Sequence, residues 1–238
     1  MQPIRPLPAG VHPPRNYSVY KSTALRHPQQ PLLKVPQGTQ LLQGPRFSKA
    51  LLPPNCADLT VHSSASPLGD RIMIHGTIVD EDGHALPNTL VEIWQCNAAG
   101  RYQHPVDQHD APLDPHFHGG GMVLTDAQGH YIFTTIKPGA YPWGNHPNAW
   151  RPAHVHFSVF GESVLQRLVT QMYFPGDPLL AYDPIFGGLP SDKARDSLVS
   201  RFDIASTKPG WALAYAFDVV LSGRAGAGTP AQPDAHAH

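Results

Sequence analysis

Two histidines separated by a single residue give the clearest chemical signal in the chain. They are His154 and His156, in the segment Arg-Pro-Ala-His-Val-His-Phe-Ser-Val-Phe at 151–160. In a β-strand successive side chains alternate between faces, so both imidazoles point one way while Val155 and Phe157 point toward a core. Two imidazoles on one face can bind a metal, but the same spacing also fits an ordinary pair of surface histidines.

A stiff loop with a tyrosine precedes these histidines. The segment Lys-Pro-Gly-Ala-Tyr-Pro-Trp-Gly at 137–144 surrounds Tyr141 with proline and glycine, so its phenol can be held in a fixed place. Tyrosine has a pKa of about 10, so it becomes a phenolate ligand at neutral pH only beside a strong positive charge. The alternative is that Tyr141 and Trp143 are half-buried aromatic residues that cap the domain.

The elements that must position these residues are short strands. Runs rich in β-branched and aromatic residues are bounded by Gly, Pro, Asn or Asp, and no helices alternate with them. This pattern predicts an all-β fold, an antiparallel β-sandwich with few short helices. The predicted strands are 71–79, 90–96, 130–136, 153–160, 167–174 and 213–221. One helix is predicted at 191–202, with Ser191 or Asp192 as its N-cap.

Composition divides the chain into three parts. Residues 1–62 form a proline-rich N-terminal arm, 63–224 the β-sandwich domain, and 225–238 a small, polar tail that we expect to be disordered. The arm also contains apolar residues, namely Tyr20, Leu25, Leu32 and Leu33. We therefore favour an arm that wraps a partner over a free linker.

Charge and targeting features exclude several classes of protein. The formal net charge of −1 gives no electrostatic footprint for nucleic acid or an anionic membrane. No stretch reaches the ~18 apolar residues of a membrane span, and the N-terminus lacks the apolar run of a secretory signal. The two cysteines, Cys56 and Cys96, have no metal-site or redox spacing. A cytoplasmic enzyme is the expectation.

Several motifs together resemble the intradiol ring-cleavage dioxygenases, and among them the members that act on protocatechuate. Tyr20-Lys-Ser and the proline-rich stretch after it resemble the N-terminal segment of those members, so the resemblance covers nearly the whole chain except the tail. The other motifs are Leu-Pro-Asn-Thr-Leu-Val-Glu-Ile-Trp-Gln (86–95), Gly-Arg-Tyr (100–102), Ala-Pro-Leu-Asp-Pro (111–115), Thr-Ile-Lys-Pro-Gly-Ala-Tyr-Pro-Trp (135–143), Trp-Arg-Pro-Ala-His-Val-His-Phe (150–157) and Thr-Gln-Met-Tyr-Phe-Pro-Gly-Asp-Pro (170–178).

The resemblance implies a non-haem Fe(III) site with four protein ligands. Tyr141 and His156 would be axial, whereas Tyr102 and His154 would be equatorial beside a hydroxide. The site would use O2 to cleave protocatechuate between its hydroxylated carbons, giving 3-carboxy-cis,cis-muconate. Fe(III), two phenolates and one hydroxide sum to zero charge. A dianionic substrate must therefore displace two anions, and Tyr141 would leave as a general base that takes a substrate proton.

The resemblance also implies substrate contacts and a partner. Arg151 would be catalytic, because a fixed guanidinium stabilises negative charge that builds on the attacked ring; its alternative role is a structural ion pair. A homologous α chain would complete the pocket in a hetero-oligomer, with the arm near that interface. The residues expected to line the substrate pocket are Tyr20, Trp94, Trp143, Arg151, Gln171 and Ile185.

A second H-x-H pair and three rival functions stay open at this stage. His116 and His118, between Pro115 and a triple glycine, are expected on a mobile loop and not as ligands. The rivals are a zinc hydrolase, a non-catalytic β-sandwich binding module, and a catechol or hydroxyquinol dioxygenase. Members of the last group usually have a helical N-terminal dimerisation domain, which the proline-rich arm does not resemble.

Overall fold

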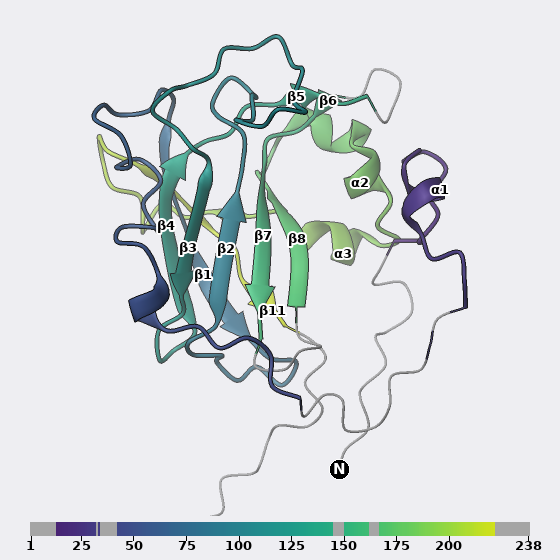
Figure 1. Cartoon of the computed structure of the whole chain (residues 1–238), viewed down its shortest axis with the longest axis horizontal. Helices are drawn as coiled ribbons and strands as arrows, with labels where there is room; N and C mark the ends of the chain where they lie inside the picture. The colour runs from purple at the N-terminus through teal and green to yellow at the C-terminus, as the bar shows by residue number, and fades with distance from the viewer. Residues whose placement is uncertain (1–12, 32, 34–41, 145–149, 162–166, 222–238) are drawn as a thin grey trace, which may run out of the picture.

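Two β-sheets packed face to face make up the body of the molecule (Figure 1). The computed structural model describes residues 13–31, 33, 42–144, 150–161 and 167–221. The sheets account for most of the regular structure in these ranges, and the helices are short and few. The predicted all-β sandwich is therefore confirmed. Among the described residues, no helix is long and apolar enough to span a bilayer.

The first sheet is built around β1 (Arg71–Val79). β4 (His130–Ile136) pairs with it antiparallel along one side. On the other side β10 (Leu213–Ala216) and β11 (Val219–Val220) pair with it in parallel, and β9 (Arg201–Phe202) pairs antiparallel with β10. The strand predicted at 213–221 is thus two short strands. Their parallel pairing with β1 is a departure from a purely antiparallel sandwich that alternating hydrophobicity does not reveal.

The second sheet is antiparallel throughout, in the order β3 (Gly120–Leu124), β2 (Leu90–Trp94), β7 (His154–Phe160), β8 (Arg167–Tyr173). Three of these strands match predicted ones to within two residues at each end. β3 was not predicted, because glycines have no side chains that could show a period of two.

Gly120 and Gly121 come directly after the loop that carries His116 and His118, and they pair with β2 as the start of β3. Gly121 has a packing reason to be glycine. A Cβ there would lie 2.5 Å from a methyl group of Leu59 and 2.8 Å from the carbonyl oxygen of Cys56. Leu59 is buried in the core although it falls inside the predicted arm.

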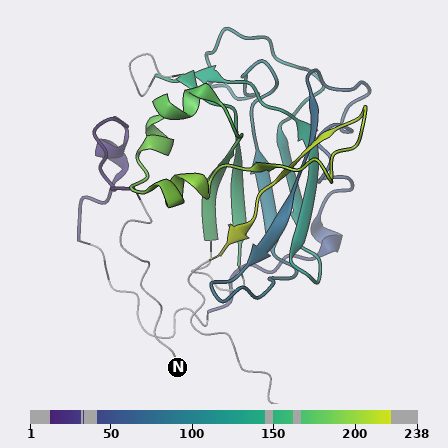
Figure 2. The ribbon, with the colours of Figure 1, turned by 180° about the vertical axis from the view of Figure 1, so that it is seen from behind.

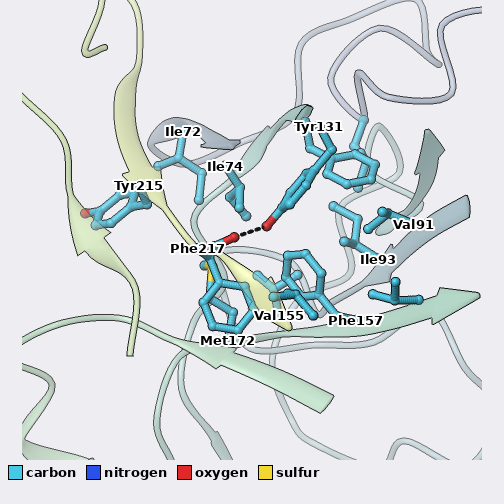
Figure 3. Packing of buried hydrophobic residues seen from close by; sticks show 14 of the residues in the cluster. Ile72, Ile74, Val91, Ile93, Tyr131, Val155, Phe157, Met172, Tyr215 and Phe217 are labelled. Atoms are coloured by element: carbon cyan, nitrogen blue, oxygen red, sulfur yellow. Dashed lines mark hydrogen bonds between the residues drawn. The ribbon is translucent and has the colours of Figure 1, made fainter. Parts of the chain in front are cut away.

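The core lies between the sheets and is filled by alternate residues of both. Ile72 and Ile74 of β1 meet Val155 and Phe157 of β7, and all four are fully buried (Figure 3). Burying each such side chain contributes roughly 1.5–3 kcal/mol. Tyr131 donates its buried hydroxyl to the carbonyl oxygen of Phe217, so this buried polar group is satisfied (Figure 3).

A set of short elements lies beside β8 and above the ends of the second sheet (Figures 1 and 2). It comprises the two-stranded ribbon β5 (Tyr141–Pro142) and β6 (Trp150–Arg151), the 3₁₀-helix η3 (Pro178–Tyr182) and the helix α2 (Pro184–Gly187). These elements enclose the end of the sheet where the two histidines lie.

The predicted helix at 191–202 is only α3 (Asp192–Asp196). Ser191 is its N-cap, as predicted, and its hydroxyl accepts a hydrogen bond from the Ala194 N–H at 3.2 Å. The remainder of the predicted helix is wrong, because residues 201–202 instead extend the first sheet as β9.

The described part of the arm contains α1 (Thr23–Arg26) and the 3₁₀-helix η2 (Lys49–Leu51). Two of its leucines are almost fully exposed, Leu25 at 88% and Leu33 at 93%. They therefore do not pack on the other described residues of this chain. Leu32 and the tail at 225–238 lie outside the described residues.

Candidate active site

The two histidines belong to a row of side chains on the outer face of the second sheet. In the strand register His156 of β7 lies between Trp94 of β2 and Gln171 of β8, and His154 lies opposite Tyr173 of β8. His154 and His156 share a face because they are two residues apart on β7, as are Gln171 and Tyr173 on β8. Trp94 lies on the same face because it is the register partner of His156. The other face of β7 carries Val155 and Phe157 into the core, as the alternation predicted.

Each histidine is held in a defined orientation. His154 is fully buried, and its Nδ1 lies 2.7 Å from the carbonyl oxygen of Pro152. Nδ1 must therefore carry the proton, which leaves the lone pair of Nε2 directed into the site. The ring of His156 stacks on Trp94 with centroids 4.8 Å apart and planes 2° apart. The two imidazole centroids are 4.9 Å apart.

Tyr141 reaches the site from the β5–β6 ribbon, where it pairs directly with Arg151. Its hydroxyl lies 3.3 Å from His154 Nε2. Tyr102 reaches it from a loop that follows β2, and its backbone N–H donates to Asp107 Oδ2 at 2.7 Å. The other oxygen of that carboxylate accepts from the His109 N–H at 2.8 Å, so Asp107 closes the Tyr102 loop.

Two glycines allow the segments that carry the tyrosines to touch. Gly100 has a φ of +80°, and a Cβ there would lie 2.2 Å from the carbonyl oxygen of Ala140. Gly139 fits against the same turn, since its Cβ would lie 2.4 Å from the Ala98 carbonyl oxygen. Only residues without side chains permit this approach, which brings the rings of Tyr102 and Tyr141 to a centroid distance of 5.5 Å.

The four aromatic side chains therefore converge although they come from three separate segments. Tyr141 and His154 have ring centroids 5.4 Å apart, and Tyr102 and His156 have centroids 6.4 Å apart. The Tyr102 hydroxyl oxygen is buried, and no hydrogen-bond partner for it exists among the described residues. A buried polar atom without a partner is costly in a native protein, and a metal ion is one group that would satisfy it.

The protonation states in this pocket fit a metal site. Burial, followed by the charge of Arg151, lowers the pKa of His156 to about 4 and the pKa of His154 well below its usual value. Both imidazoles are thus neutral and able to donate lone pairs at neutral pH. Burial raises the pKa of Tyr102 and of Tyr141, so both phenols ionise only beside an added positive charge. Two phenols and two neutral imidazoles suit a highly charged cation.

Arg151 is buried beside these four residues. One of its terminal nitrogens, Nη1, lies 3.4 Å from the Tyr141 hydroxyl and 3.1 Å from His154 Nε2. The other, Nη2, donates to Gln171 Oε1 at 2.6 Å and forms an ion pair with Asp183 Oδ2 at 2.8 Å. The structure therefore shows the ion pair considered for Arg151, and it places the guanidinium beside Tyr141 and His154.

A cleft of ≈ 880 Å³ opens in front of the site. Among the residues expected to bind substrate, Trp94 and Trp143 line this cleft, as do Tyr102, Tyr141 and His156. The four others do not line it. Arg151 is buried behind it, and Gln171 accepts a hydrogen bond from Arg151. Tyr20 packs edge-on against Trp143 at 4.9 Å, and Ile185 is the second residue of α2.

The second H-x-H pair lies apart from the cleft lining. His116 Nδ1 is 2.6 Å from the Ser63 hydroxyl, and His118 Nδ1 is 2.9 Å from Gln103 Oε1. Each therefore has a polar partner of its own. The sequence reasoning missed Asp183, which lies on the far side of Arg151. The only signal for it was its place before Pro184, since an Asp before a proline often starts a helix.

Family models, related sequences and solved structures all point to one family of dioxygenases. A family model described as dioxygenase matches residues 42–223, and one described as protocatechuate 3,4-dioxygenase beta subunit N terminal matches residues 5–38. The chain is 56% identical over 219 residues to the protocatechuate 3,4-dioxygenase beta chain of Burkholderia cepacia, which covers 91% of each protein.

Two further proteins extend the comparison. The protocatechuate 3,4-dioxygenase alpha chain of Burkholderia cepacia is 28% identical over 189 residues, 76% of this chain and 89% of that one. The solved structure of 3-chlorocatechol 1,2-dioxygenase from Rhodococcus opacus 1CP superimposes with a TM-score of 0.55 at 25% identity, over 76% of this chain and 70% of that one. Since one family model spans most of the chain and the beta chain is matched over nearly its full length, this chain belongs to the intradiol ring-cleavage dioxygenase family, in its protocatechuate 3,4-dioxygenase beta-chain branch.

Proposed function

We propose that this chain uses ferric iron and O2 to cleave protocatechuate between its two hydroxylated carbons, giving 3-carboxy-cis,cis-muconate. One observation carries the proposal. Two tyrosines and two histidines from three segments meet at one point, where the buried Tyr102 hydroxyl has no partner among the described residues. The likeness to a protocatechuate 3,4-dioxygenase beta chain supports the choice of substrate.

The proposed ligands are Tyr102, Tyr141, His154 and His156. Bound ferric iron would supply the positive charge that ionises the two phenols and would activate the substrate diphenol toward O2. The chain itself supplies neutral, oriented imidazoles, because burial keeps both histidines unprotonated and Pro152 fixes the tautomer of His154. The donors are in place before any substrate enters, so little reorganisation is required.

Tyr141 is the proposed base for a substrate proton. Its hydroxyl lies within hydrogen-bonding distance of both Arg151 and His154, while that of Tyr102 has no such partner among the described residues. Its place in a two-residue ribbon, and not in the core, gives the ring a side open to the cleft. As a phenolate it would accept the proton of a substrate hydroxyl within hydrogen-bonding reach.

Arg151 and the two tryptophans would position the substrate ring. Trp94 and Trp143 form apolar walls of the cleft that suit a flat aromatic ring. The Arg151 guanidinium lies 5.3 Å from the centroid of the Trp143 ring, so it can stabilise negative charge on a substrate carbon held there. The substrate contacts of Tyr20, Gln171 and Ile185 belong to the same proposal.

A homologous α chain is the proposed partner. This chain resembles an alpha chain of Burkholderia cepacia as well as a beta chain, which supports a hetero-oligomer of two related subunits. Leu25 and Leu33 of the arm have no cover within the described chain, and they are suited to such an interface. The division at about residue 62 into an arm and a catalytic domain is proposed with it.

Metal analysis and visible spectroscopy of the purified protein test this function most directly. We expect stoichiometric iron, a visible absorption band from ferric phenolate, and a change in that band on anaerobic addition of protocatechuate. Turnover with protocatechuate should exceed turnover with catechol. A colourless zinc protein would instead support the hydrolase, and protein without stoichiometric metal would support a binding module.

A further inference from the structure

Asp183 has no part in the proposed reaction, yet it is one of the most deeply buried charged residues of the described chain, at 1% exposure. It faces Arg151 along one edge of the guanidinium. Arg151 Nε donates to its Oδ1 at 3.3 Å, and Nη2 donates to its Oδ2 at 2.8 Å. This two-point contact fixes the plane of the guanidinium as well as its position.

Tyr173 closes the other side of this contact. It is fully buried, and its hydroxyl lies 2.9 Å from Asp183 Oδ2 and 3.1 Å from Arg151 Nη2. Gln171 accepts from Nη2 as well, at 2.6 Å. Both hydrogens of Nη2 and the hydrogen of Nε are thereby directed away from the cleft. Nη1 is then the nitrogen that faces Tyr141 and His154.

We propose that Asp183 and Tyr173 are positioning residues for Arg151, which hold its guanidinium so that Nη1 is aimed at the reacting centre. The role rests on the proposed function, because it gives Arg151 a fixed direction in that reaction. An arginine has several rotatable bonds and would otherwise occupy many orientations. A donor stabilises developing charge best when it is already in place, so the buried partners contribute to the rate without touching substrate.

The Asp183 carboxylate also connects Arg151 to α2. Asp183 is the N-cap of α2, which begins at Pro184, and its Oδ1 accepts a hydrogen bond from the backbone N–H of Ile185 at 3.1 Å. Loss of the carboxylate should therefore disturb both Arg151 and the Ile185 segment. Loss of the Tyr173 hydroxyl should disturb Arg151 and its partners Gln171 and Asp183 but leave the cap of α2 in place, because the hydroxyl bonds to these three side chains and not to the Ile185 N–H. The Tyr173 ring also keeps its edge contact with Phe186 at 5.2 Å.

Three single variants of the intact, iron-loaded protein, assembled with its partner chain where the partner is required, test the role. For Tyr173→Phe we expect kcat per bound iron to fall about tenfold, with KM changed less than about twofold. For Asp183→Asn we expect a fall of about 100-fold, together with a higher KM. Tyr131→Phe is the matched control, since it also removes a buried tyrosine hydroxyl but one bonded to Phe217 in the core. It should keep the wild-type kcat.

Two further measurements separate positioning from general damage. The iron content and the absorbance change with anaerobic protocatechuate should stay at wild-type level in Tyr173→Phe. In the double variant with Asp183→Asn, the loss of kcat should be smaller than the product of the two single losses, because both act through Arg151. If Asp183→Asn fails to fold, Tyr173→Phe and its Tyr131→Phe control still test the positioning role.

Wild-type kcat per iron in Tyr173→Phe, or a loss of activity that only follows loss of iron, would overturn the positioning role and leave the proposed function intact. A wild-type protein without iron or ring-cleaving activity would instead overturn the proposed function, and this role with it.

Discussion

Trp94 and His156 face each other across β2 and β7, and their rings are stacked almost in parallel, with centroids 4.8 Å apart. One face of the indole thus supports an imidazole that we propose as an iron ligand, while the residue also lines the cleft. A stacked support of this kind restricts the rotation of the ligand ring. Trp94 therefore connects the proposed metal site with the cleft.

Trp94→Ala should weaken both functions. Loss of a side chain that supports a metal ligand typically lowers metal affinity by about 10- to 100-fold. We therefore expect a correspondingly lower concentration of chelator to remove the iron. KM for protocatechuate should rise as well, because one wall of the cleft is removed. Trp94→Phe, which keeps an aromatic face, should retain most of the iron affinity. Equal chelator sensitivity in Trp94→Ala and the wild type would contradict this.

Substitution of the proposed ligands should remove the metal or its colour. Tyr102→Phe deletes one phenol oxygen without changing the ring, and His154→Ala deletes the imidazole whose Nε2 points into the site. Both variants should lose the visible band or the bound iron. His116→Ala is the control, since His116 bonds to Ser63 outside the cleft, and it should change neither. A coloured, iron-loaded Tyr102→Phe protein would exclude Tyr102 as a ligand.

Gly100→Ala should destabilise the fold and spread the two tyrosines apart. The new methyl group would meet the Ala140 carbonyl oxygen at 2.2 Å, and the residue would have to keep a φ of +80°. We expect the free energy of unfolding to fall by roughly 2 kcal/mol or more in urea titrations. Gly120→Ala is the matched control, because no atom lies within 4 Å of its added Cβ. Equal loss of stability in both variants would argue against the close approach.

The stability of the metal-free protein should depend on pH through the buried histidines. The pKa of His156 is about 4 in the folded chain and about 6.5 in the unfolded chain. Between pH 4 and pH 6.5 the unfolded chain therefore binds a proton that the folded chain does not. Folding stability is therefore lost as pH falls from 6.5 to 4, by up to about 1.4 kcal/mol per pH unit from this group. Urea titrations of chelator-treated protein should show the slope, and His156→Gln should reduce it.

The arm and its partner can be tested by co-expression. Expressed alone, this chain should have low activity, and co-expression with a homologous α chain should give a hetero-oligomer with restored turnover. Leu25→Asp and Leu33→Asp, which place charges at the two most exposed of the described leucines in the arm, should weaken that assembly without changing the fold. A lone chain that is monomeric and fully active on protocatechuate would contradict the proposed partnership.

The strands and the histidine pair were predictable because they depend on local alternation. β1 and β4 have the predicted bounds, and Val155 and Phe157 fill the core while His154 and His156 face outward. The convergence of Tyr102 and Tyr141 was a different matter. It depends on Gly100 fitting against Ala140, a contact between segments about forty residues apart, and no periodicity in the sequence encodes it. For the tyrosines the family resemblance supplied the prediction.

Other features had no local signal at all. β3 begins in a glycine run and so shows no alternation, and β10 pairs in parallel with β1 although the two are far apart in sequence. The helix expected at 191–202 has suitable propensity, but tertiary pairing of Arg201 and Phe202 with β10 overrides it. Asp183 resembled an ordinary helix cap, and only the fold shows that it also meets the Arg151 side chain.

The two faces of β7 link the proposed metal site to correct pairing of the strands. If this strand paired one residue out of step, Val155 and Phe157 would turn toward the cleft and both imidazoles would be forced into the hydrocarbon interior. A chain with this register error could neither bury its apolar core residues nor bring His154 and His156 together at the cleft. With the proposed ligands, only chains whose strands are correctly aligned would bind the metal, because one face of these seven residues packs in the core and the other carries two of the proposed ligands.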